Sequence, residues 1–250
     1  EHGELKRSLS NRHLQLIAIG GAIGTGLFMG SGKTISLAGP SILVIYMIIG
    51  FMVFLVMRAL GELLLSNLQY KSFIDFATDL IGPWAGYFVG WTYWLCWITI
   101  GIADLSAIIY YLQFFNNGLP FSPEEGVMIS VAAIVFIMGL NLVTVKLFGE
   151  MEFWFALVKI IAIVVLIAVG LWMVFTGFTN DVGTVASFSH IWEHGGLFPT
   201  GAMGFLAGFQ IAIFAFVGVE LVGTTAAETK DPEKNLPKAV NSIPIRIIIF

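Results

Sequence analysis

The sequence predicts an all-α membrane protein that crosses the bilayer several times, and three observations support this class. Of the 250 residues, 58% are hydrophobic and only 11% are charged, and the mean hydropathy is +0.91. Soluble domains typically carry about 25% charged residues. Long apolar runs recur along the chain, and basic residues gather in alternate connectors between them. We therefore expect a lipid bilayer to surround most of this chain.

Six apolar segments are each long enough for a membrane helix, which needs about 20 mostly apolar residues. They cover residues 14–37, 42–65, 84–115, 127–145, 153–175 and 204–225. Residues 1–13 are expected to form a polar cytoplasmic tail and residues 226–242 a cytoplasmic loop. Residues 243–250 read as the start of a seventh span, so we interpret the chain as the amino-terminal part of one transmembrane domain.

The distribution of Lys and Arg predicts the orientation of these spans. Nine of the twelve basic residues lie before the first span or in connectors that follow even-numbered spans. The connectors at residues 116–126 and 176–203 have none. Cytoplasmic loops of membrane proteins carry an excess of Lys and Arg. The amino terminus is therefore predicted to be cytoplasmic.

The sequence lacks the residues that several other classes of function require. Cys96 is the only cysteine, which excludes a disulfide framework or a thiolate metal site. His190 and His194 are four apart, but no third ligand accompanies them in the sequence, so we expect no metal site. No nucleophile–base pair or carboxylate cluster stands out, so an enzyme is not expected, nor is a nucleic-acid partner.

The glycine-rich stretch at residues 19–34, IGGAIGTGLFMGSGKT, interrupts the first span. A phosphate-binding loop would need glycine at position 27, which is Leu27. Close helix packing explains some of these glycines, but they do not keep to one helix face. An interrupted helix explains the whole cluster, and in a membrane such a break persists only where it lines a cavity or meets a ligand.

The sixth span carries a second candidate interruption. Its sequence at residues 214–220, FAFVGVE, places a glycine and a carboxylate near the middle of an apolar segment. Two interrupted spans, five apart, are typical of inverted-repeat transporters with the binding site between them.

These motifs carry a family resemblance. Residues 21–28 (GAIGTGLF), 214–220 and 228–232 (ETKDP) resemble the amino acid permeases of the amino acid–polyamine–organocation superfamily, and residues 12–13, 148–154 and 241–244 resemble its bacterial members. Residues 16–39 are most similar to the branch for D-serine, D-alanine and glycine. The resemblance implies about twelve helices in two inverted five-helix repeats with helices 1 and 6 broken, of which this chain would hold about six and a half.

The resemblance also implies a substrate site at the two breaks. The N–H groups of Thr25 and Gly26, next to Gly24, and the Thr25 hydroxyl would bind the substrate carboxylate. Carbonyl groups at the breaks would bind the α-ammonium group, and Phe214 would cover the substrate. Ile100, Ala103 and Asp104 of the third span would line the pocket for the substrate side chain. Alternatively, Asp104 is a polar group that is hydrogen-bonded between helices. The full set of expected binding residues is Ala22, Ile23, Gly24, Thr25, Gly26, Ile100, Ala103, Phe214, Val217 and Gly218.

Charged residues inside spans are costly and are functional candidates. By resemblance to proton-coupled members, Lys159 is expected to couple proton and substrate movement; alternatively it extends to the cytoplasmic surface or pairs with Glu150 or Glu152. Glu220 could lie on the proton path or accept hydrogen bonds near the break. Arg58 and Glu62, four apart, are expected to form an intrahelical pair or an inner-gate contact.

The resulting prediction is a secondary active transporter in the cytoplasmic (inner) membrane of a bacterium. It would import glycine, D-alanine and D-serine, with L-alanine as a further candidate substrate, by proton symport and alternating access. The proton would be the coupling ion, membrane lipid would surround the protein, and no cofactor is expected. An aromatic or other neutral L-amino acid permease is the alternative within the family, and an ion or solute channel is the alternative class. The sequence carries no signal for the oligomeric state.

Overall fold

The computed structural model describes residues 23–142, 145–221, 231, 233–238 and 241. Within these residues the chain is helical and has no β-strand, apart from an isolated bridge between Thr179 and Val185. Four described stretches are long and apolar enough to cross a membrane: Thr25–Ser66, Pro83–Asn116, Pro123–Asn141 and Phe153–Thr176. The predicted all-α polytopic class is confirmed.

The helices follow one another along the chain with short connectors. In order they are α2 (Thr25–Ala38), η1 (Gly39–Ser41), α3 (Ile42–Ser66), α4 (Phe73–Leu80), α5 (Pro83–Leu112), η2 (Gln113–Asn116), α6 (Pro123–Asn141), α7 (Val145–Thr176), η3 (Phe188–Ile191), α8 (Gly201–Ala212) and η4 (Ile213–Phe216).

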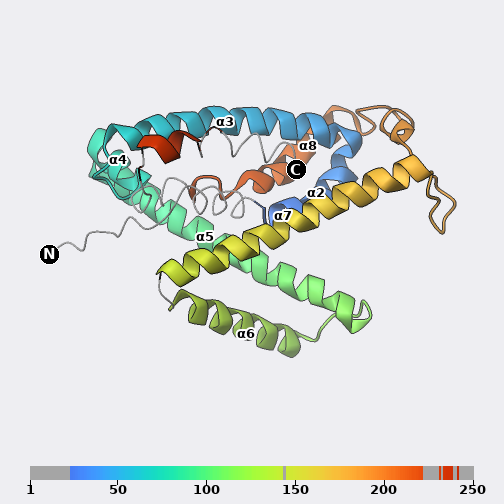
Figure 1. The fold of residues 1–250 in the computed structure, drawn as a ribbon, viewed down its shortest axis with the longest axis horizontal. Coiled ribbons are helices and arrows are strands. Elements are labelled where there is room, and N and C mark those ends of the chain that lie inside the picture. Colours follow the sequence, from blue (N-terminus) through green and yellow to red (C-terminus); the bar gives the residue numbers. More distant parts are fainter. Residues whose placement is uncertain (1–22, 143–144, 222–230, 232, 239–240, 242–250) are drawn as a thin grey trace.

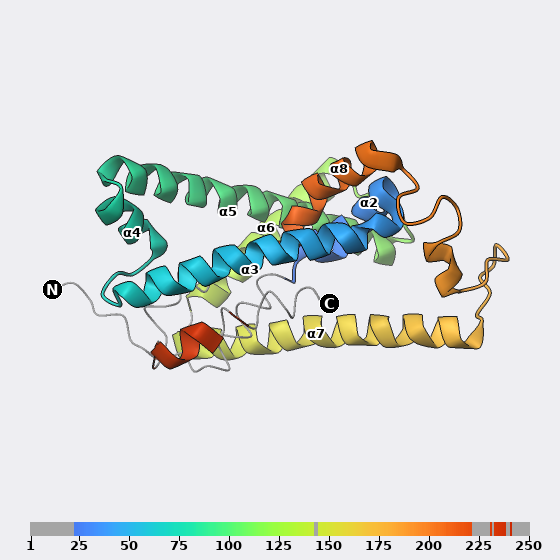
Figure 2. The same cartoon turned by 90° about the horizontal axis from the view of Figure 1, so that it is seen from above.

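Segments far apart in the sequence meet at one end of the molecule. Helices α3 and α5 are joined at one end by α4, and α2 lies beside α8 near the opposite end of α3 (Figures 1 and 2). The packing of α2 is most extensive against α8 and η4, while α4 packs on α5. The first and sixth predicted spans are therefore neighbours.

The buried core lies where α3 meets α2 and α8. Ile45, Ile49 and Met57 share one face of α3 at helical spacing and are buried. Gly208 of α8 allows the close approach, because a Cβ there would lie 2.9 Å from the Cβ of Ala38. A larger side chain at this position would push the helices apart.

Most apolar side chains of α5, α6 and α7 remain exposed. In the most apolar 18-residue stretch of α6, none of the residues is buried. In the corresponding stretches of α5 and α7, 6% of the residues are buried. Burying apolar surface is worth about 25 cal/mol per Å² in water. Such helices are stable only where lipid or further protein covers them.

Local capping explains where the helix bounds differ from those predicted. The fourth span begins at Pro123 and not at residue 127, because Ser122 and Glu125 form a capping box ahead of the apolar run. Helix α4, which was not predicted, starts with the same device, in which Ser72 and Asp75 cap each other's backbone N–H groups. Helix α7 begins at Val145, ahead of its apolar membrane stretch Phe153–Thr176, which agrees with the predicted fifth span.

Part of the expected cytoplasmic loop is also helical. Residues 233–238 form a short helix in which Leu236 is fully buried, so residues 226–242 are not a simple loop. The expected tail at residues 1–13 and the expected seventh span at residues 243–250 lie outside the described residues.

Candidate functional site

The first helix end at the site is the start of α2. Gly24 is extended, with φ −136° and ψ −156°, and its carbonyl accepts hydrogen bonds of 3.1 Å from the N–H groups of Leu27 and Phe28. Helical geometry therefore begins at Thr25, inside the stretch predicted to be interrupted. The first N–H groups of a helix have no intrahelical acceptor, so those of Thr25 and Gly26 suit an anion.

The second helix end is the interruption after η4. Val217 is extended (φ −68°, ψ 136°), and Gly218 has φ +105°, a conformation that favours glycine. The N–H of Gly218 donates a 2.8 Å hydrogen bond to Glu220 Oε2. The predicted break in the sixth span is confirmed at these residues.

The two helix ends touch. A Cβ on Gly26 would overlap the carbonyl group of Phe214 and would lie 2.9 Å from the backbone nitrogen of Ala215. Only glycine permits this approach of backbone to backbone. The contact holds the start of α2 against the last turn before the break.

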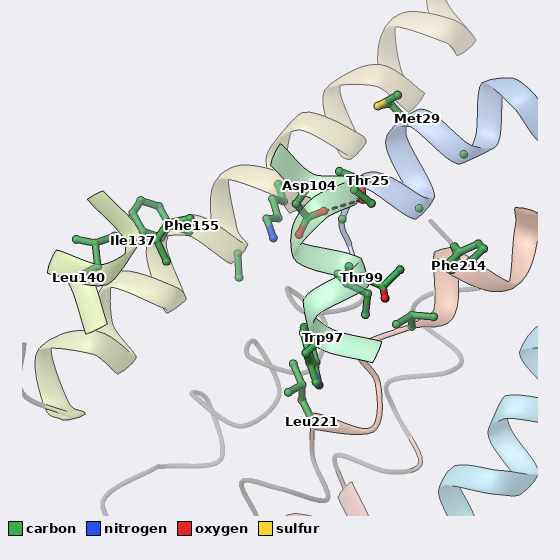
Figure 3. A pocket seen from close by; sticks show the side chains of 18 of the residues that line it. Thr25, Met29, Trp97, Thr99, Asp104, Ile137, Leu140, Phe155, Phe214 and Leu221 are labelled. Carbon is green, nitrogen blue, oxygen red and sulfur yellow. Dashed lines mark hydrogen bonds between the residues drawn. The ribbon is translucent and has the colours of Figure 1, made fainter. Parts of the chain in front are cut away.

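A cavity of about 780 Å³ lies beside this contact. It is lined by residues of α2, α5, α6, α7, α8 and η4, and most of the side chains labelled in Figure 3 are apolar. Its polar side chains are Thr25, Thr99, Asp104, Asn141 and Lys159. An apolar cavity with a few placed polar groups is the usual form of a small-molecule site.

A hydrogen bond crosses between helices at the cavity wall. The Thr25 hydroxyl donates to Asp104 Oδ1 at 2.8 Å, and both residues are half-buried (Figure 3). Asp104 therefore lines the cavity and is also hydrogen-bonded between helices. Lys159 lines the same cavity from α7.

The structure brings most of the expected site residues together and separates a few. Nine line the cavity: Gly24, Thr25, Gly26, Ile100, Ala103, Asp104, Lys159, Phe214 and Val217. Ile23 instead belongs to the buried core, being 1% exposed. Gly218 is buried at the break and Glu220 hydrogen-bonds to it, and neither residue lines the cavity. Ala22 lies outside the described residues.

Arg58 and Glu62 form an ion pair within α3, which is one of the two arrangements expected for them. Arg58 Nε lies 3.7 Å from Glu62 Oε1, and their side chains are 62% and 76% exposed. Neither residue lines the cavity. An exposed pair of this kind is worth about 0–1 kcal/mol in water.

The sequence did not reveal the cavity walls supplied by α6 and α7. These include Phe136, Ile137, Leu140, Asn141, Met151 and Phe155. Helices that are apolar on every side give no periodic signal for the face that turns inward. Asn141, a polar residue near the end of an apolar run, was the one available signal.

These features define an integral membrane protein in which the start of α2 meets the interruption after η4 beside a largely apolar cavity. The chain belongs to the amino acid permease family: the family model described as "Amino acid permease" matches residues 13–250.

Similar curated proteins share this family. The chain is 69% identical over 246 residues to the D-serine/D-alanine/glycine transporter of Escherichia coli K12, covering 98% of this chain and 51% of that protein. It is 53% identical over 247 residues to the amino-acid permease AapA of Bacillus subtilis, covering 99% of this chain and 52% of the relative. It is 46% identical over 252 residues to the aromatic amino acid transport protein AroP of E. coli K12, covering 100% and 53%. The chain thus spans about half the length of the curated relatives that it matches.

Proposed function

We propose that the permease containing this chain is a secondary active transporter, not an enzyme or a channel, and that its substrates are small neutral amino acids. The observation that carries the proposal is the contact between Gly26, at the start of α2, and Phe214, just before the interruption after η4, beside a cavity with both an acidic and a basic side chain. Broken helices of this kind serve ligand binding at mid-membrane in transporters.

The proposed binding mode places the substrate carboxylate at the start of α2. The backbone N–H groups of Thr25 and Gly26, together with the positive end of the helix dipole, would stabilise the anion. The Thr25 hydroxyl already donates to Asp104, so it would reach the substrate only by giving up that bond. The ammonium group would be bound by carbonyl groups of Phe214 and Val217 at the second break.

The preference for small substrates rests on the relatives and on the cavity wall. The relative at 69% identity is named for D-serine, D-alanine and glycine, whereas the relative at 46% is named for aromatic amino acids. Ile100 and Ala103, which line the cavity with Trp97 and Phe214, are apolar side chains that suit a neutral substrate. L-alanine is included among the candidate substrates.

Proton symport through alternating access is the proposed energy coupling, with no cofactor. Lys159 lines the cavity near the helix breaks, where a cationic side chain could respond to proton and substrate binding. Glu220 is the second candidate for the proton path, besides its bond to Gly218. We propose a bacterial inner membrane location with a cytoplasmic amino terminus, supported by the nine basic residues on one side.

Uptake by the full-length protein in proteoliposomes tests the proposal. A pH gradient, acidic outside, should drive accumulation of labelled glycine, D-serine and D-alanine above equilibrium, and a protonophore should abolish it. L-alanine and phenylalanine are tested in parallel. Phenylalanine uptake without glycine uptake would assign the protein to the aromatic branch. Flux that never exceeds the equilibrium distribution under a proton gradient would refute proton symport.

A further inference from the structure

We propose that the connector between α7 and α8 holds a site for a divalent transition metal such as Zn²⁺, with His190, Glu193 and His194 as ligands. Each of these residues offers one ligand atom, and the three atoms all lie within 4.8 Å of one another. Two imidazoles and one carboxylate are a ligand set found in zinc sites that keep a position open for water. The proposal is independent of the transport function.

The strongest geometric evidence is the contact between His190 and Glu193. His190 Nδ1 lies 3.4 Å from Glu193 Oε2. With metal–ligand bonds of about 2.0–2.2 Å, two ligands of a tetrahedral zinc ion lie about 3.3–3.5 Å apart. The observed separation therefore matches one edge of a zinc tetrahedron without movement of either side chain.

The other nitrogen of His190 has the partner that a metal ligand requires. Nε2 lies 2.7 Å from the carbonyl oxygen of Val185. A carbonyl oxygen can only accept, so Nε2–H donates to it, and Nδ1, which faces Glu193, is the nitrogen that would bind an ion in its unprotonated form. Metal-binding histidines almost always donate their second ring N–H to a carbonyl or carboxylate in this way.

The connector fixes this arrangement through its backbone. Val185 is paired with Thr179 in the isolated β-bridge, and Ala186 N–H donates 2.8 Å to the Phe178 carbonyl. Ser187 then caps η3, which carries His190. The carbonyl that orients His190 is therefore held by the preceding turn.

The third ligand, His194, is placed by an unusual backbone conformation. Its φ is +56°, a left-handed value that is uncommon for residues other than glycine, and Gly195 and Gly196 also have positive φ. The turn brings the two imidazole rings to a centroid separation of 5.9 Å with a 45° tilt. A side-chain rotation of His194 would close the remaining gap to a common ion.

The spacing of His190 and His194 alone did not predict this site, because the third ligand becomes apparent only in the folded connector. Glu193 lies directly before His194, and only the turn at the end of η3 reveals that its carboxylate faces His190. A metal held here would tie η3 to the turn that follows it. The ion would thereby stiffen the connector leading into α8.

Zinc binding to the full-length permease tests the proposal. The protein is purified with a histidine-free tag, stripped with a chelator, and titrated with Zn²⁺ against a fluorescent zinc indicator. The parent protein is expected to bind Zn²⁺ with micromolar or tighter affinity. His190→Ala and His194→Ala should each weaken that binding by about ten-fold or more, since loss of even an outer-shell partner costs about 10–100-fold.

Matched controls separate this site from other zinc-binding groups. Asp181→Asn changes an exposed carboxylate of the same connector and should leave the affinity unchanged. Glu193→Gln, which preserves shape, should weaken binding, and Co²⁺ substitution should give visible d–d absorption that His190→Ala removes. Size-exclusion profiles confirm that the variants remain folded. Equal zinc affinity of the parent and the His190→Ala/His194→Ala double variant, or no binding at all, would overturn the proposal and leave a histidine–carboxylate ion pair only.

Discussion

The hydroxyl of Thr25, at the first position of α2, donates a 2.8 Å hydrogen bond to Asp104 Oδ1 on α5. The bond ties the start of the first described helix to the third predicted span. It also places a carboxylate beside the N–H groups proposed to bind the substrate carboxylate. The Thr25–Asp104 bond therefore sets how the start of α2 lies against α5.

Removing the Thr25 hydroxyl is expected to weaken substrate binding. Thr25→Val keeps the side-chain shape but leaves Asp104 without this donor, and hydrogen bonds to charged groups are worth about 1.5–3 kcal/mol. We expect the Kd for D-alanine to rise about ten-fold or more, measured by equilibrium binding to the full-length protein. Thr25→Ser, which keeps the hydroxyl, should bind close to the parent value. Unchanged affinity in Thr25→Val would show that the bond has no role in binding.

The close contact between Gly26 and the Phe214 carbonyl group leaves no room for a side chain at position 26. In Gly26→Ala, the new Cβ would overlap the Phe214 carbonyl and separate the two helix ends. Uptake of glycine in proteoliposomes is expected to fall by about ten-fold or more, as displacements of about 1 Å can cost 10²-fold in catalysis. Gly32→Ala on the same helix is the control, because nothing lies within 4 Å of its Cβ position. Equal loss in both variants would mean that helix flexibility, not the close contact, matters.

Replacing Lys159 should impair proton-driven accumulation of substrate more than the exchange of internal for external substrate. Lys159→Ala is expected to abolish pH-driven accumulation of D-alanine while retaining exchange of internal for external substrate. Lys33→Ala, an exposed lysine on α2, should keep both activities. Full accumulation by Lys159→Ala under a proton gradient would exclude Lys159 as the coupling group.

Cysteine labelling checks the orientation given by the basic residues. In a cysteine-free full-length background, which includes Cys96→Ser, we introduce Lys71→Cys and Asp181→Cys. A membrane-impermeant thiol reagent applied to intact cells should label position 181 and spare position 71. Labelling only at position 71 would reverse the proposed topology.

The sequence was most informative where an unfavourable residue sat in an apolar run. The glycines near Thr25, and the glycine and carboxylate at Gly218 and Glu220, predicted helix interruptions, because such residues are costly within membrane helices unless the backbone turns there. The long apolar runs likewise predicted α3, and the stretch Pro83–Asn116 formed by α5 and η2, to within one residue at each end.

Features that depend on packing between segments were less predictable. The Thr25–Asp104 bond joins residues 79 apart, and no local pattern specifies it. The inward faces of α6 and α7 could not be read from helices that are apolar all round. Helix α4 could have been predicted, because Ser72 and Asp75 have capping-box spacing ahead of apolar residues.

The central claim is that the two interrupted helices bind the backbone groups of a free amino acid. Displacement of labelled D-alanine from the purified full-length permease tests it most directly. We expect D-alanine and glycine to displace the label, whereas D-alaninamide, which lacks the carboxylate, and propionate, which lacks the ammonium group, should fail at the same concentrations. Equal displacement by D-alaninamide would contradict a carboxylate site at the start of α2.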